Sequence, residues 1–165
     1  MFDLKPISPE AVDAALEKAR HYRLLNEPMQ AESICLDVLE VHPDNQEAVA
    51  TLILALSDQL ERRISPFFED AEAALPRLTN RYRESYYHGL LCERRAKAHF
   101  RSGLPGSGYV AYEWFRKAMT LYEVAETLRP PDNDDAILRW NTCARIINRF
   151  PEIQPDPVKS EPYLE

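Results

Sequence analysis

Glycine and β-branched residues are scarce in this sequence, which leaves little material for strands and the tight turns between them. Only 4 of the 165 residues are glycine, and three of these lie within residues 103–108. Strands favour valine, isoleucine and threonine, and two-residue hairpins need glycine or asparagine at positive φ. Helix is therefore the one class that is well supplied, and the sequence predicts an all-α protein.

Cysteine and long apolar runs are scarce as well. The 3 cysteines, Cys35, Cys92 and Cys143, are odd in number and far apart, which fits neither a disulfide framework nor a zinc site. We expect them to be buried free thiols. The longest apolar run, residues 48–56, is far shorter than the roughly 20 residues that span a bilayer. The first residues also lack the pattern of a secretory signal, so we expect a cytoplasmic protein with no membrane partner.

Positive charge is in the minority but unevenly spread. The formal net charge is -7, which argues against a protein that coats nucleic acid over its whole surface. Residues 81–117 nevertheless contain eight basic residues and only three acidic ones. The basic residues are Arg81, Arg83, Arg94, Arg95, Lys97, Arg101, Arg116 and Lys117. The chain therefore has a basic middle within an acidic whole.

Proline divides the chain into short periodic stretches. Ser8-Pro9 and Ser65-Pro66 have the form of helix starts, because a serine hydroxyl can cap free amides and proline fits the first turn. Pro76 falls inside an apolar stretch and should kink or shorten its helix. We expect seven helices, at about residues 9–25, 29–41, 46–62, 66–80, 82–101, 109–128 and 134–150.

These helices define the expected domain organisation. We expect residues 1–8 to form an N-terminal lead segment before the first helix, residues 9–150 a single helical domain, and residues 151–165 a tail. The tail is acidic and rich in proline, and it has no apolar periodicity. Such a composition predicts an extended, flexible segment.

Small residues, an aromatic residue and a closing proline recur at regular spacing. Small residues let two antiparallel helices cross closely, the aromatic residue fills the gap beside them, and proline ends the second helix. The pattern is carried by Ala19, Tyr22, Ala31, Cys35 and Pro43 early in the chain and by Ala96, His99, Ala118, Tyr122, Ala125 and Pro130 later. Over about residues 9–150 the chain resembles the tetratricopeptide repeat (TPR) family, whose unit is roughly 34 residues. The resemblance implies antiparallel helix hairpins stacked as a short TPR-like right-handed solenoid of about seven helices.

The same resemblance implies where a ligand would bind. TPR proteins hold peptides in a concave groove lined by the first helix of each hairpin. In this chain the groove would include Leu16, Arg20, Arg23, Leu54, Arg94, Lys97 and Arg101. It would be apolar at its centre and basic along one wall, which suits a peptide carrying acidic groups because arginine presents a fork that matches carboxylates.

We therefore predict a non-enzymatic protein-protein interaction adaptor or chaperone-like module. The 4 histidines are scattered, so no metal, cofactor or catalytic site is expected. A bacterial secretion chaperone is a narrower form of this hypothesis, since those small acidic TPR proteins are similar in length and stacked design.

Other interpretations stay open. Tyrosine and arginine alternate along residues 81–101, so bases could stack on tyrosine while arginine meets phosphate, which would make this an RNA-binding helix. The same arginines could instead be a solvated helix face. The acidic tail, residues 151–165, could also dock in the groove of its own chain or of a neighbour.

Overall fold

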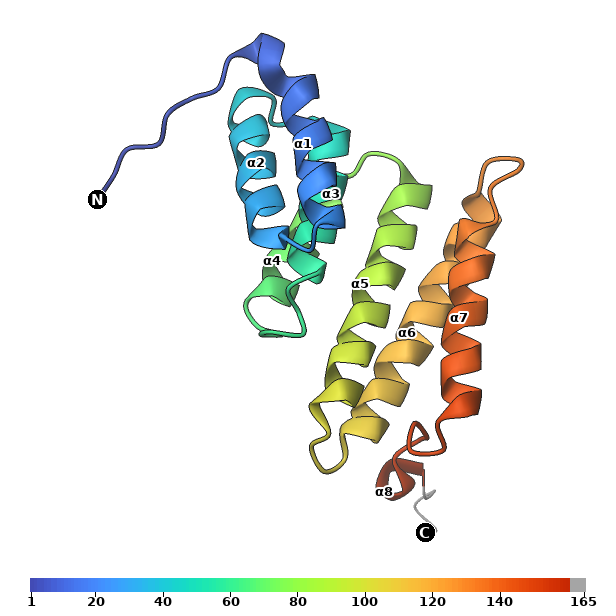
Figure 1. The fold of residues 1–165 in the computed structure, drawn as a ribbon. Coiled ribbons are helices and arrows are strands. Elements are labelled where there is room, and N and C mark those ends of the chain that lie inside the picture. The colour runs from blue at the N-terminus through green and yellow to red at the C-terminus, as the bar shows by residue number, and fades with distance from the viewer. Residues whose placement is uncertain (161–165) are drawn as a thin grey trace. The chain divides into compact units, whose positions relative to one another are not determined.

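The structure, a computed structural model, describes residues 1–160, and every regular element within them is a helix (Figure 1). The all-α prediction is confirmed for this range. The chain divides into two compact units, Met1–Asn80 and Arg81–Glu165. The single domain expected over residues 9–150 therefore contains the boundary between two units, which falls just after the irregular segment 78–80.

The first unit contains four α-helices (Figure 1). A short 3-10 helix, Pro9–Ala11, leads into α1 (Val12–Leu24), which pairs with α2 (Pro28–Val41). Helix α3 (Gln46–Ser57) packs on both α1 and α2, and α4 (Phe67–Ala74) packs on α3. Each helix of the unit thus packs against the helices that precede and follow it in the chain.

Small residues allow the close packing of this unit. Ala19 of α1 and Ala31 of α2 have no exposed surface, as their place in the repeat pattern predicts. Within residues 48–56 of α3 every side chain except that of Leu54 is buried. Helix α3 is therefore the centre of the unit and packs between its neighbours.

Two helix ends differ from the sequence predictions. Helix α3 ends at Ser57 and not near residue 62, because the chain turns through a run of short-range bonds such as Arg62 N to Gln59 O. The Ser8 side chain makes no capping hydrogen bond, whereas Asn45 caps α3 by accepting from Ala48 N at 2.9 Å.

Pro76 shortens its helix as predicted. Helix α4 stops at Ala74, and Pro76 lies in the 3-10 helix Leu75–Arg77 that follows. Proline supplies no N–H and cannot continue an α-helical ladder, so the last turn tightens.

The second unit is built on one long hairpin. Helices α5 (Arg81–Ser102) and α6 (Ser107–Leu128) each have 22 residues, and α7 (Asp135–Arg149) packs on α6 (Figure 1). A short helix, α8 (Pro157–Ser160), follows. None of the helices in residues 1–160 is both long and apolar enough to cross a membrane.

The core of this unit lies between α5, α6 and α7. Ala96, Ala118 and Ala125 are fully buried, as the repeat pattern predicts, and the rings of Phe115 and Tyr122 fill the space beside them. Ile153, with 2% of its surface exposed, also belongs to this core. Packing therefore continues past residue 150 into the segment predicted to be a tail, while residues 161–165 lie outside the described residues.

Gly89 sets the distance between α5 and α6. A Cβ atom at this position would lie 2.7 Å from Cε1 of Tyr122, closer than carbon atoms approach without a shift. The Tyr122 ring thus rests directly on the α5 backbone. A larger residue at position 89 must push either the ring or the helix away.

We predict that Gly89→Ala destabilises the protein despite its better helix propensity. Overpacking costs about 1–3 kcal/mol, which exceeds the gain of about 1 kcal/mol that alanine brings to a helix. Urea unfolding measures the difference. Thr120→Ala on the exposed side of α6 is the control, with a change within about 0.5 kcal/mol. A more stable Gly89→Ala protein would contradict the close approach.

Candidate functional site

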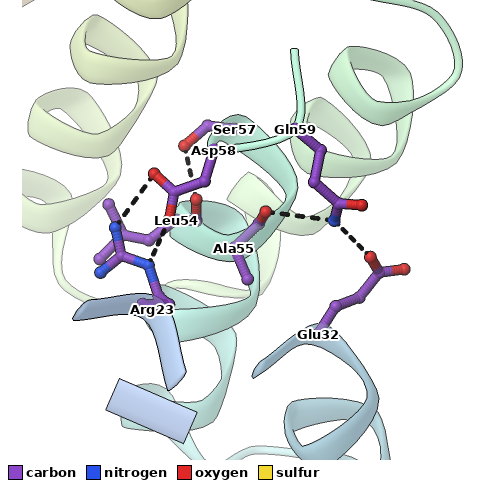
Figure 2. Close-up of polar contacts among 7 residues, drawn as sticks. All are labelled: Arg23, Glu32, Leu54, Ala55, Ser57, Asp58 and Gln59. Carbon is purple, nitrogen blue, oxygen red and sulfur yellow. Dashed lines mark hydrogen bonds and ion pairs between the residues drawn. The ribbon is translucent and has the colours of Figure 1, made fainter. Parts of the chain in front are cut away.

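The predicted groove arginines of the first unit lie on α1 and are paired with an acid of α3, Glu47, and with Asp58 directly after that helix. Arg20 Nη2 lies 3.3 Å from Glu47 Oε2, and both side chains are about half exposed. Arg23 donates from Nε to Asp58 Oδ2 at 2.7 Å and from Nη2 to Oδ1 at 3.3 Å (Figure 2). The positive charge expected along this face is therefore matched by negative charge from the same unit.

The two predicted groove leucines have different surroundings. Leu54 lies on α3 between Glu47 and Asp58 in the sequence and is partly exposed. Leu16 is only 4% exposed and belongs to the core. The prediction that Leu16 lines an open groove is therefore wrong. Helix α1 packs on both α2 and α3, and Leu16 lies on the covered side of α1.

The end of α3 is held from two sides. Gln59, itself buried, donates from Nε2 to Glu32 Oε2 of α2 at 2.6 Å and to Ala55 O at 3.2 Å (Figure 2). On the other side Arg23 of α1 holds Asp58. These contacts hold the C-terminal end of α3 in place, and with it the helix face on which Leu54 lies.

The predicted groove residues of the second unit share one face of α5. Arg94, Lys97 and Arg101 are three and four residues apart, which is the spacing of neighbours on a helix surface. Arg101 is exposed, while Arg94 and Lys97 are partly buried. Lys97 Nζ lies 2.5 Å from Oε1 of Glu93, one turn earlier on the same helix.

Glu93 is the centre of a buried polar cluster between α5, α6 and α7. It has no exposed surface. The Tyr122 hydroxyl of α6 donates to Oε2 at 2.7 Å, and Arg139 Nη1 of α7 lies 3.3 Å from Oε1, the oxygen that Lys97 also contacts. One carboxylate therefore joins all three long helices of the unit.

The protonation of the groups around Glu93 follows from its charge and from burial. Burial raises the pKa of Tyr122, and the neighbouring Glu93 charge raises it further, so the hydroxyl stays protonated and can donate. Burial lowers the pKa of Arg139, but Glu93 and a hydrogen bond to Tyr86 raise it by more. The cluster thus contains stable donors on every side of the carboxylate.

Glu93 belongs to no sequence motif, but its position in the sequence gives one indication that it is buried. It lies four residues after Gly89 and three before Ala96, on a face of α5 that the small residues predict to be buried. A lone acid on such a face must have partners, because an unpaired buried charge is strongly unfavourable. Arg139, which is 46 residues away, could not be identified as that partner from spacing alone.

The tyrosines considered for base stacking pack against one another. The Tyr82 and Tyr86 ring centroids are 5.9 Å apart, and Tyr86 lies 6.0 Å from the Tyr122 ring. The Tyr82 hydroxyl donates to Asn133 Oδ1 at 3.1 Å. These rings are partly buried in packing between helices of the second unit.

The cysteines and acids form no metal site in the described part of the chain. Cys35, Cys92 and Cys143 are buried and free, as predicted. Residues 1–160 contain no group of three or more histidine, cysteine, aspartate or glutamate residues placed to hold a metal ion.

Comparison with protein-family models, with curated proteins and with solved structures finds no match to this chain. The TPR resemblance therefore stays a hypothesis based on sequence pattern. The described residues offer two sites, the α1–α3 face and the Glu93 cluster.

We predict that Glu93→Gln strongly destabilises the protein. Removing one partner of a buried ion pair costs roughly 3–5 kcal/mol, and we expect the lower end because Lys97 and Arg139 are partly exposed and can be hydrated. Urea unfolding measures the loss. The control is Glu113→Gln on the exposed side of α6, with a change within about 0.5 kcal/mol. Equal stability of the two variants would mean that the cluster does not hold the helices together.

We predict that alkaline pH destabilises the fold through its buried thiols. Burial raises the pKa of Cys35 and of Cys143 from 9.0 to about 12. Because the folded-state pKa is the higher one, this contribution is complete below pH 9 and is lost as pH rises toward 12. Urea unfolding at about pH 8 and about pH 11 should show the loss, and Cys35→Ala with Cys143→Ala should reduce it. A pH-independent stability would contradict the prediction.

Proposed function

We propose that this chain is a non-enzymatic interaction protein of the cytoplasm, an adaptor or chaperone-like module that binds a peptide segment of another protein. The observation that carries the proposal is the α1–α3 face, where two ion pairs flank a partly exposed leucine. Arg20 with Glu47 and Arg23 with Asp58 connect the two helices, and Leu54 lies between the two acids along α3. Such a surface offers an apolar contact with charges at both ends.

The ion pairs indicate the composition of the peptide. The exposed Arg20–Glu47 pair contributes only about 0–1 kcal/mol, so an acidic residue of a ligand can compete with Glu47 for Arg20. The Arg23–Asp58 pair is less exposed and has two hydrogen bonds, so it should stay intact. We therefore propose that the peptide places an apolar side chain against Leu54 and an acidic residue near Arg20.

A TPR-like stacking of the hairpins is part of this proposal. It is supported by the burial of Ala19, Ala31, Ala118 and Ala125, which occupy the small positions of the repeat pattern. The alternative of RNA binding through residues 81–101 gains less support, because the packing of Tyr82 and Tyr86 leaves less ring surface for bases.

Peptide selection tests the proposal. The full chain is used to select binders from a random peptide library, and the affinities of the recovered peptides are measured for wild type and for Leu54→Asp. Loss of a leucine contact of about 1.5–3 kcal/mol predicts a decrease in affinity of about tenfold or more.

Leu36→Asp is the matched control. Leu36 is an exposed leucine on α2, so its replacement makes the same chemical change away from α3. Urea unfolding of both variants shows that they remain folded. Peptides whose affinity is unchanged by Leu54→Asp, or is reduced equally by both changes, would argue against the α1–α3 face as the binding site.

A further inference from the structure

The Glu93 cluster contains two cations for one carboxylate. Lys97 and Arg139 approach the same oxygen, and the third partner, Tyr122, is neutral. Asp135 lies one helical turn before Arg139, but it makes no ion pair with it in the part of the chain that the structure describes. One positive charge of the cluster is thus left without a bonded counter-charge.

Both cations extend from the core to the surface. The side chain of Lys97 is 27% exposed and that of Arg139 is 37% exposed, whereas the side chain of Glu93 is 1% exposed. Within residues 1–160 Lys97 has Glu93 as its hydrogen-bond partner, and Arg139 has Glu93 and Tyr86. An ammonium and a guanidinium carry more donors than these contacts use.

The cations are also held in place before any ligand arrives. Glu93 is fixed by the Tyr122 hydroxyl, and the Tyr122 ring rests on Gly89. Side chains that are already ordered lose little entropy on binding, so a weak ligand charge can be recognised.

We propose that Lys97 and Arg139 form a carboxylate-binding site between α5 and α7, which takes an aspartate or glutamate side chain, or a terminal carboxylate, of a peptide. The surplus of one positive charge matches one carboxylate. A phosphate group carries about -1.5 to -2 at pH 7 and would overcompensate it. The site rests on the proposed function in that its ligand is a peptide, but its residues are separate from the α1–α3 face.

Titration of the full chain with acetate tests the site without a known partner. The NMR signal of the Arg139 side-chain Nε–H should shift and saturate as acetate replaces chloride at constant ionic strength. Lys97→Met, which removes one cation and keeps the aliphatic stem, should weaken acetate binding about tenfold. Lys117→Met, an exposed lysine of α6, should leave it unchanged.

Three results would overturn the site. They are a linear shift without saturation, equal binding in Lys97→Met and wild type, and tighter binding of inorganic phosphate than of acetate. Lys97→Arg keeps the charge and should keep acetate binding, which separates loss of the site from loss of the fold. The two proposals can fail separately. If acetate binding saturates but the selected peptides bind Leu54→Asp as well as wild type, the Lys97–Arg139 site is supported and the α1–α3 face is ruled out as the peptide site.

Discussion

The Glu93 carboxylate is buried, and the second unit is arranged to provide its partners. Tyr122 reaches it from α6 and Arg139 from α7, while Lys97 comes from the same helix. A buried ion pair is weak evidence for added stability, but breaking one leaves a charge that nothing compensates. The cluster therefore restricts how α5, α6 and α7 can pack, and Gly89 permits the close approach that brings the Tyr122 hydroxyl to Glu93.

Ion pairing has a different role in the first unit because the carboxylates of its pairs, unlike Glu93, are not fully buried. Arg23 and Asp58 are each about one fifth exposed, and Gln59 with Glu32 holds the other side of α3. Exposed ion pairs contribute little to stability. The core of this unit depends on α3, whose apolar residues fill the space between its neighbours. The half-exposed Arg20–Glu47 pair is therefore a polar contact of this unit that a ligand can reach.

Helix positions were predictable because local signals define them, while the charged contacts were not. Pro76 ended α4 as its missing N–H requires, and the small residues of the repeat pattern are buried. The pairing of Arg23 with Asp58, 35 residues apart, and of Glu93 with Arg139 depends on which helix faces are adjacent. Leu16 was misplaced for the same reason, since the spacing of one helix does not say how much of it its neighbours cover.

The charge of Glu93 at neutral pH decides whether the Glu93 cluster carries one surplus positive charge or two. Carbon NMR of the side-chain carboxyl, assigned by comparison with Glu93→Gln, measures this charge directly. A chemical shift typical of an ionised carboxylate is the predicted result, because Lys97 and Arg139 both approach the same oxygen. A shift typical of a protonated carboxyl would contradict both the ion-pair cluster and the single-carboxylate site built on it.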